Sequence, residues 1–186
     1  MKIVMIYDQI QAGAGIKDDH MIPLGLNKGV VGPAIMMEPY LKRANANVLA
    51  CLYSGDGYYK ENKEEVSRKL CAMVTKLQAD IVICGPCFDN KGYAKMAAEV
   101  AADINSKTDA RALAAMAEEC EEVIATYKDK IRIVKMPKKG APGLNHALEG
   151  MCELAYAMAR RCFCKRILLL MIDKRILLGN PLYELL

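Results

Sequence analysis

Three short segments combine glycine with polar side chains and could together bind a small molecule. They are residues 8–15 (DQIQAGAG), 54–59 (SGDGYY) and 85–90 (GPCFDN). Glycine allows the backbone to approach a ligand closely and to adopt a positive φ angle. The acidic and amide side chains beside it supply hydrogen-bond acceptors and donors. These segments are therefore the first candidates for a binding or catalytic site.

Cys84 and Cys87 form the one Cys-x-x-Cys motif of the chain and allow two interpretations. If Cys87 lies at a helix N-terminus, its pKa is lowered and the thiol could act as a nucleophile or redox group. Alternatively, both cysteines are small packing residues, Cys84 at a strand end and Cys87 in a turn. A thioredoxin-type pair starts its helix within the motif, whereas here we expect the helix only after Asn90. This spacing favours packing.

Carboxylate, amide and imidazole side chains near these segments also have two interpretations. Asp56 and Asp89 could be paired acceptors at neighbouring strand ends, or each could bond its own turn or cap a helix. Asn62 could likewise cap the helix that follows it. His20 lies in a glycine-bearing loop, where a single histidine is more often solvated than catalytic. We expect His146 on the exposed side of a late helix.

Several well-known sites are excluded by spacing. The stretch AGAGIKDD at 12–19 is not the G-x-G-x-x-G fingerprint of dinucleotide-binding proteins, and no P-loop motif occurs. Two histidines and scattered carboxylates form no recognisable zinc pattern, and no Ser-His-Asp arrangement can be argued. We therefore expect no metal.

Strands and helices alternate along the chain. This alternation predicts a three-layer αβα sandwich with a mostly parallel sheet, similar to flavodoxin or Rossmann folds. In such sheets ligands bind outside the carboxyl ends of the strands, near a topological switch point. The three segments follow the first three expected strands, so we expect them to meet there. The expected strands are 2–7, 46–53, 80–84, 110–116 and 131–134, and the expected helices are 33–43, 62–78, 91–105, 117–128 and 144–159, with a long loop over 8–32.

Composition narrows the class of protein. The 186 residues are 53% hydrophobic, which suits a single domain with a sizeable core. The net charge of +4 lies in residues 160–186, so residues 1–159 are formally neutral and match a nucleic-acid backbone poorly. Eight cysteines without a secretory signal indicate reduced thiols and a cytoplasmic protein. No apolar stretch is long enough to span a membrane.

The division of the chain follows from the same pattern. We expect residues 1–159 to be one α/β domain and residues 160–186 to be a basic, apolar tail. The tail repeats KRILL nine residues apart. It could be a packing arm or an oligomer contact, and an ordinary last helix or strand is equally compatible with it.

Five stretches resemble one family. They are YDQIQAGAG at 7–15, GVVGPA at 29–34, SGDGYYKEN at 54–62, ADIVICGPCFDNKGY at 79–93 and, more weakly, IRIVKMPKKGAPGLNHAL at 131–148. In this order, over about residues 1–159, they resemble the component B (selenoprotein B) family of glycine, sarcosine and betaine reductases from anaerobic bacteria. The resemblance implies a cytoplasmic oxidoreductase subunit for a small amino-acid-like substrate, working with other subunits of the complex.

The resemblance also implies where the cofactors are. In that family a pyruvoyl group on a partner subunit engages the substrate's amino group, and a selenocysteine takes the carbon fragment, which passes to a selenoprotein A partner. The selenocysteine region lies beyond the matched part, and the surroundings of Cys162 and Cys164 do not resemble it. The turn after the third strand carries Lys91-Gly92 where the family usually has Gly-Arg. We therefore expect no cofactor within this chain and no complete reductase activity from it alone.

Two main hypotheses follow. In the first, the chain is a substrate-side reductase subunit, in which Asp56 and Asp89 hold an ammonium group, glycine amides hold a carboxylate or phosphate, and Cys87 joins them as a catalytic group. Its predicted substrate contacts are Gln9, Gly13, Gly15, Gly55, Tyr58, Asn62, Gly85, Phe88 and Tyr93. In the second, the chain is a homo-oligomeric binding or assembly subunit without the redox centre. A generic nucleotide-binding domain is disfavoured by the missing phosphate loop.

Overall fold

The computed structural model describes the backbone of residues 1–177 and the side chains of residues 1–160. A six-stranded sheet forms its middle layer, in the order β2-β3-β1-β4-β5-β6. Five strands are parallel, and β2 at one edge runs antiparallel to β3. The strands are β1 (Lys2–Tyr7), β2 (Gly25–Lys28), β3 (Asn47–Tyr53), β4 (Ile81–Cys87), β5 (Arg111–Ala117) and β6 (Arg132–Met136).

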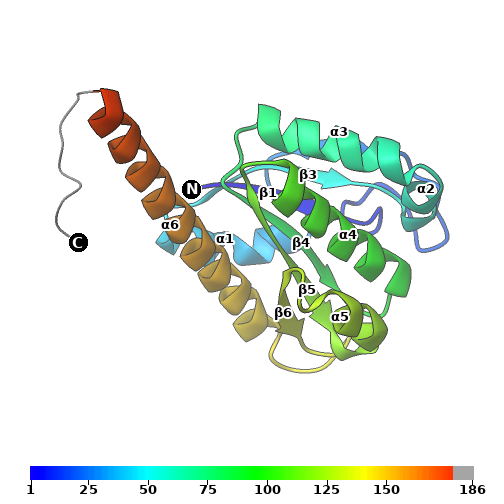
Figure 1. The fold of residues 1–186 in the computed structure, drawn as a ribbon. Helices are drawn as coiled ribbons and strands as arrows, with labels where there is room; N and C mark the ends of the chain where they lie inside the picture. The colour runs from blue at the N-terminus through cyan, green and yellow to red at the C-terminus, as the bar shows by residue number, and fades with distance from the viewer. Residues whose placement is uncertain (178–186) are drawn as a thin grey trace.

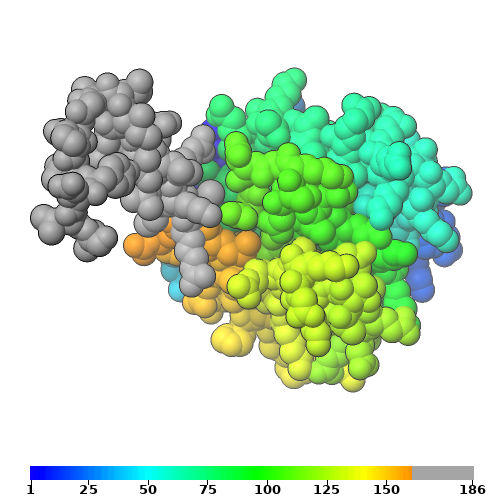
Figure 2. Space-filling view, in the orientation of Figure 1, coloured from blue at the N-terminus to red at the C-terminus, as the bar shows by residue number. Residues whose placement is uncertain are grey.

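Helices cover both faces of the sheet (Figure 1). The helices α2, α3, α4 and α5 pack on one face, and α1 and α6 on the other. Figure 2 shows the outer side of the layer formed by α2, α3, α4 and α5, with α3 and α4 lying next to each other. The predicted three-layer α/β fold is confirmed. The helices are α1 (Pro33–Arg43), α2 (Asp56–Glu61), α3 (Lys63–Lys76), α4 (Lys91–Lys107), the single turn η1 (Glu118–Cys120), α5 (Glu121–Tyr127) and α6 (Leu144–Leu177).

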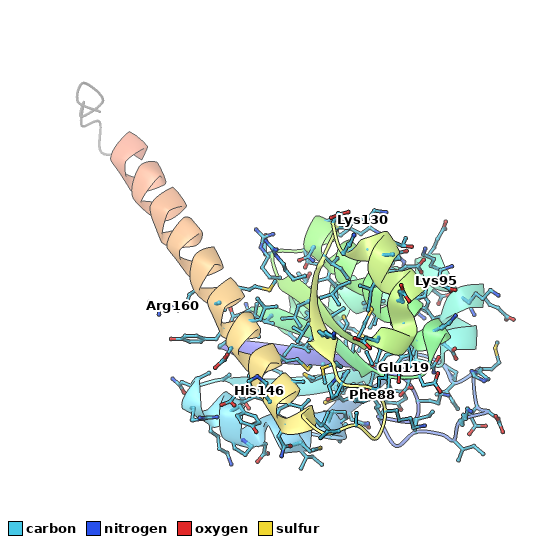
Figure 3. All side chains as sticks on the ribbon, turned by 90° about the horizontal axis from the view of Figure 1, so that it is seen from below. Phe88, Lys95, Glu119, Lys130, His146 and Arg160 are labelled. Carbon is cyan, nitrogen blue, oxygen red and sulfur yellow. The ribbon has the colours of Figure 1, made fainter. Side chains whose placement is uncertain are left out.

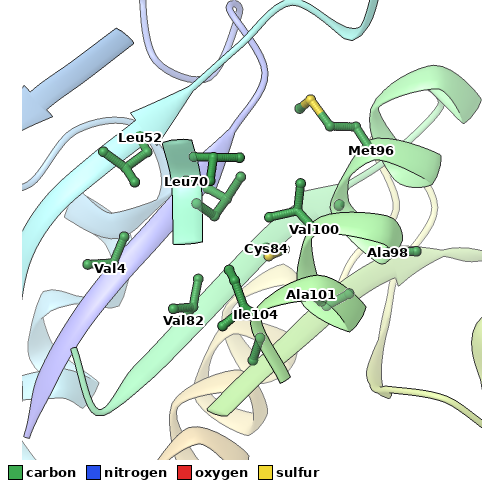
Figure 4. Close-up of a cluster of buried hydrophobic side chains, with 14 of the residues drawn as sticks. Val4, Leu52, Leu70, Val82, Cys84, Met96, Ala98, Val100, Ala101 and Ile104 are labelled. Carbon is green, nitrogen blue, oxygen red and sulfur yellow. The ribbon is translucent and has the colours of Figure 1, made fainter. Parts of the chain in front are cut away.

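The strands are apolar on both faces because helices bury both. In β1, Val4 and Ile6 point into the α3–α4 side, whereas Ile3 and Met5 point into the α1–α6 side. Figure 4 shows part of the first cluster, where side chains of β1, β3 and β4 meet those of α3 and α4. Each aliphatic side chain buried in this way contributes about 1.5–3 kcal/mol. The sheet is thus a rigid base for the loops at its ends.

Three local predictions differ from the structure. The expected loop 8–32 contains β2, a four-residue strand whose sequence GLNK has little β propensity and whose order comes from pairing with β3. The expected loop 54–59 contains the start of α2, with Asp56 in its first turn where a helix favours negative charge. The third strand continues to Cys87 through Gly85, whose φ of 117° an L-residue rarely adopts.

The helix starts also differ in detail. Asn90, rather than Asp89, caps α4 by accepting a hydrogen bond from the Tyr93 amide. Asn62 stands at the N-cap position of α3, but its side chain donates to the Tyr58 carbonyl instead of capping. His146 lies exposed in the first turn of α6, as predicted.

Helix α6 does not stop at residue 159. Its backbone continues to Leu177 and extends beyond the edge of the sheet (Figure 1). The interpretation of residues 160–186 as a packing arm or oligomer contact concerns side chains outside the described residues, and so does any role of Cys162 and Cys164. Within the described part of the chain, no helix combines the length and the hydropathy required to cross a membrane.

Candidate functional site

The strand order places a switch point between β1 and β4. Counted without the antiparallel edge strand, the order is second-first-third-fourth-fifth, as in flavodoxin-like sheets. The chain leaves β1 toward β3 on one side and later returns to β4 on the other. In sheets of this type, ligands commonly bind outside the carboxyl ends of the strands at such a point. Figure 3 shows Phe88 and Glu119, which follow β4 and β5, at this end of the sheet, and Lys130 at the opposite end.

The segment after β1 is held tightly at this switch point. Asp8 is 4% exposed, and its carboxylate accepts a hydrogen bond from the Gln11 amide at 2.8 Å. Burial raises the pKa of Asp8, and the nearby carboxylate of Asp56 raises it further. Gln9 is completely buried and donates to the Ile16 carbonyl, while its Oε1 atom has no hydrogen-bond partner among the described residues.

Tyr93 links the ends of β1 and β4 through buried hydrogen bonds. It is only 1% exposed, and its hydroxyl lies 3.0 Å from the Ile6 carbonyl and 3.1 Å from Oε1 of Gln11. Gln11 in turn donates from Nε2 to the Pro86 carbonyl at 2.5 Å. This buried network holds the segment after β1 against the end of β4. Tyr93 therefore supports the site from within the core and does not line its surface.

Asp56, in the first turn of α2, contacts two other segments at this edge of the sheet. Its Oδ1 lies 2.6 Å from Nδ1 of His20, and a Cβ atom on Gly92 would lie only 2.0 Å from its Oδ2. The carboxylate is thus wedged between the His20 imidazole and the first turn of α4, where backbone N–H groups favour negative charge. Asp56 is 14% exposed and His20 is 50% exposed. The hydrogen bond to Asp56, followed by its charge, raises the pKa of His20.

Of the two interpretations of Cys87, the reactive thiol with a lowered pKa does not fit its surroundings. Cys87 is the last residue of β4 and is completely buried, and burial raises its pKa well above the ordinary value. Burial also raises the pKa of Cys84, which faces the same cluster. The six cysteines with described side chains are all free and buried. A neutral buried thiol is a poor nucleophile, so the environment of Cys87 fits packing.

The predicted glycines have different surroundings. Gly13 has a φ of 65° and Gly15 packs against Asp19. A Cβ on Gly55 would lie 2.2 Å from the His20 carbonyl oxygen, and one on Gly85 would lie 2.7 Å from the Ala115 carbonyl oxygen. Gly55 and Gly85 are therefore required for close backbone contacts within the protein.

The remaining predicted residues flank the cluster. Tyr58 is half-buried and its amide donates to the His20 carbonyl at 2.9 Å. Phe88 is half-buried, and its carbonyl accepts the Cys120 thiol. Asp89 is exposed. Asn62 bonds the carbonyl of Tyr58, as described above.

Sequence reasoning missed three residues of the cluster, Asp8, Gln11 and His20. Asp8 and Gln11 stood inside the first predicted segment, but nothing in the sequence distinguished them from Gln9. His20 was interpreted as solvated because no pattern links it to Asp56, 36 positions away. The signal that could have found it is the SGDG motif, since Gly55 and Gly57 are small where the His20 backbone packs.

Two cavities lie away from this cluster. One of about 720 Å³ lies between α5 and β6 and is lined by Lys128, Arg132 and Lys135 together with isoleucines and glutamates. Another of about 540 Å³ lies in the groove between α3 and α4. In the part of the chain with described side chains, no group of histidine, cysteine and carboxylate residues is arranged to hold a metal ion.

Comparison with known proteins gives one family and several relatives. The profile of the glycine/sarcosine/betaine reductase selenoprotein B family matches residues 1–165. The sarcosine reductase complex component B subunit beta of Peptoclostridium acidaminophilum is 24% identical over 160 residues, covering 86% of this chain and 36% of that protein. No solved structure matches the chain significantly.

Two further relatives are glycine reductase complex component B subunits gamma. That of Symbiobacterium thermophilum is 30% identical over 107 residues, which are 58% of this chain and 24% of the relative. That of Carboxydothermus hydrogenoformans is 26% identical over 133 residues, which are 72% and 30% respectively. The chain thus spans about a third of the length of the curated relatives it matches.

Proposed function

The chain belongs to the glycine/sarcosine/betaine reductase selenoprotein B family, and from this premise we propose that it is a substrate-side subunit of such a reductase complex. It would hold a small amino acid or an N-methyl derivative at the carboxyl edge of its sheet, for reductive cleavage by the complex. The relatives support this proposal because their names place them in glycine and sarcosine reductase complexes.

One observation carries the assignment of the site. Asp56 and His20 come from different segments and pair at 2.6 Å beside the first turn of α4, directly at the switch point. Opposite charges in one small cluster suit a zwitterion, because carboxylates attract an ammonium group and an imidazolium attracts a carboxylate. Asp89 from the loop after β4 is the second acidic candidate of this edge.

The redox groups would come from partner subunits. The sequence contains no selenocysteine, and the resemblance puts the pyruvoyl group on a partner subunit. The cysteines with described side chains are buried, and where a shift in pKa is resolved burial raises it, so none of them suits the role of an exposed reducing thiol. This chain's own contribution would be binding and orientation of the substrate in the cytoplasm of an anaerobe.

Ligand binding tests the proposal directly. Titration of the protein with glycine, sarcosine and betaine, followed by calorimetry and ligand-observed NMR, should show saturable binding of at least one. The double variant Asp56→Ala/Asp89→Ala should weaken it by about tenfold or more, as expected for loss of a charged contact. Asp109→Ala/Asp129→Ala removes two exposed aspartates that precede β5 and β6 at the opposite edge and is the matched control. Unchanged binding in the first variant would refute the assignment.

A binding or assembly subunit without catalysis is the second candidate. Its support is α6, whose backbone continues beyond the sheet to Leu177. The native mass of the protein purified from its own host, with copurifying chains identified, separates the two. A pyruvoyl-containing or selenoprotein partner favours the reductase subunit, whereas a homo-oligomer that depends on residues 160–186 favours the assembly role.

A further inference from the structure

His20 is fixed on both sides of its Cα by the glycines that follow β3. Its carbonyl accepts the Tyr58 amide at 2.9 Å, and its Cβ lies 3.0 Å from the position of a Cβ on Gly57. The same carbonyl lies so close to Gly55 that no side chain would fit there. The loop of residues 16–22 therefore packs directly on the start of α2. The exposed histidine is therefore anchored by its backbone.

The side chain is oriented as well as anchored. Nδ1 of His20 lies 2.6 Å from Oδ1 of Asp56, so the ring keeps its Nδ1–H toward this carboxylate. Asp56 itself cannot move toward α4, because its Oδ2 already abuts Gly92. The Nε2 atom is on the opposite side of the ring from Nδ1, and half of the side chain is exposed. Nε2 is thus available to a ligand, with its direction set by Asp56.

Charge around the imidazole favours its protonated form. The groups that raise the pKa of His20 are Asp56 from α2 and Asp18 and Asp19 from its own loop. Gly57 and Tyr58 of α2, which contact the His20 Cβ and carbonyl, carry no charge. A protonated imidazole held in this way offers one free N–H donor, which pairs best with an anionic oxygen.

We propose that Nε2 of His20 contacts the carboxylate of the bound ligand and that Asp56 is the residue that positions it. This inference rests on the proposed function and makes it more specific, since it assigns the recognition of the carboxylate to a side chain rather than to glycine amides. It also makes His20 a specificity-determining residue, because a ligand with an amino group and no carboxylate has nothing to offer Nε2.

The chain contains only two histidines, which makes the test simple. Imidazole NMR signals are recorded for the full-length protein with glycine and with methylamine, which lacks the carboxylate. We expect glycine to shift the His20 signals and to leave those of His146, in the first turn of α6 on the other face of the sheet, unchanged. His20→Gln should lower glycine affinity by about 10–100-fold, the range for loss of one charged hydrogen bond. It should change methylamine affinity by less than about twofold.

His146→Gln is the matched control and should leave glycine affinity unchanged. Asp56→Asn provides a readout of positioning that a purely structural role would not move, since it should lower the pKa of His20. In the wild type, glycine affinity should fall as pH rises through the pKa of His20, because the donor proton is lost. His20→Gln should lack this dependence.

The outcomes separate this inference from the proposed function. If the wild type binds glycine while His20→Gln binds it equally well, the inference is wrong and the proposed function stands. If the wild type binds none of glycine, sarcosine or betaine between pH 5 and 8, both are wrong. Loss of glycine affinity in His20→Gln with retained methylamine affinity and an unchanged melting temperature supports both.

Discussion

The segments 54–59 and 85–90, at the carboxyl ends of β3 and β4, contain the same types of residue, a glycine, an aspartate and an aromatic side chain, and the structure uses them differently. After β3, Asp56 reaches out of the sheet and orients the half-exposed His20. β4 itself stays extended through Gly85 to Cys87, and the following Tyr93 turns inward under the end of β1. One segment therefore presents ionisable groups at the switch point, and the other supports them.

The difference follows from the position of each strand. β4 is flanked by β1 and β5 and covered by helices on both faces, so residues at its end remain buried. β3 lies next to the short edge strand β2, and the loop that precedes β2 carries His20 over its carboxyl end. A motif at the end of a central strand is thus more readily used for packing than the same motif near an edge.

The largest effect on the free energy of unfolding should come from truncating Tyr93, which supports the site from within the core. Tyr93→Ala removes a buried aromatic side chain and should lower the free energy of unfolding by about 3–5 kcal/mol. Tyr93→Phe removes only the hydroxyl that contacts Ile6 and Gln11 and should cost about 0.5–1.5 kcal/mol. Urea unfolding measures both. The half-buried Tyr58, which belongs to the β3 segment, is the control, and an equal loss in Tyr58→Ala would remove the distinction between the segments.

The thiols of the β4 segment should be unreactive in the folded protein. Cys84 and Cys87 are completely buried, so alkylation by iodoacetamide has to await opening of the core. We expect the peptide that contains both to be labelled at least about 100-fold more slowly than in urea, consistent with an opening free energy of several kcal/mol. Mass spectrometry of peptides follows the labelling. Fast modification of Cys87 would instead support the reactive thiol suggested by its Cys-x-x-Cys motif.

One added methyl group at Gly55 should disrupt the contact between the segment after β3 and His20. Gly55→Ala places a Cβ 2.2 Å from the His20 carbonyl oxygen, so the loop of residues 16–22 has to shift. The expected cost is about 1–3 kcal/mol, typical of overpacking, with faster proteolysis in that loop. Gly150→Ala, in α6, should be neutral or stabilising by up to about 1 kcal/mol, because an added Cβ there would meet no atom within 4 Å apart from the nearby backbone of its own helix. Equal melting temperatures for the two variants would contradict this packing.

The sequence predicts most of the fold because its strands and helices have clear periodicity. The apolar run 2–7 and the helical spacing of Val66, Leu70 and Val74 lead directly to β1 and α3. β2 was missed because GLNK is ordered only by its partner strand, and α2 was missed because a glycine and two tyrosines obscure the helix. Both omissions involve tertiary contacts that override local propensity.

The site was predicted less completely for a similar reason. Its location followed from topology alone, since the ends of β1, β3 and β4 have to meet at one edge. The pairing of Asp56 with His20 and the inward orientation of Tyr93 depend on how loops pack, and no spacing encodes that. The spacing of Cys84 and Cys87 favoured packing over a reactive thiol, and the burial of Cys87 at the end of β4 fits that interpretation.

The smallest expected effect concerns Asp8, which lies between the two segments. Its pKa is raised above the unfolded value by burial, so this carboxyl contributes stability that is complete below about pH 3.8 and is lost as pH rises through the folded-state pKa. Asn at this position can still accept the Gln11 amide without a charge. Asp8→Asn should therefore stabilise the protein at pH 7 by about 0.5–2 kcal/mol, and the gain should disappear near pH 3.

Urea unfolding at the two pH values measures this difference. Asp109→Asn, an exposed change near the opposite edge, should alter stability by less than about 0.5 kcal/mol at pH 7. If Asp8→Asn instead lowers stability at pH 7, the charged form of Asp8 is favoured by something the folded chain binds there. Asp8 would then belong with Asp56 and His20 among the groups that meet the ligand, rather than with Tyr93 and Gln11 among those that support the site.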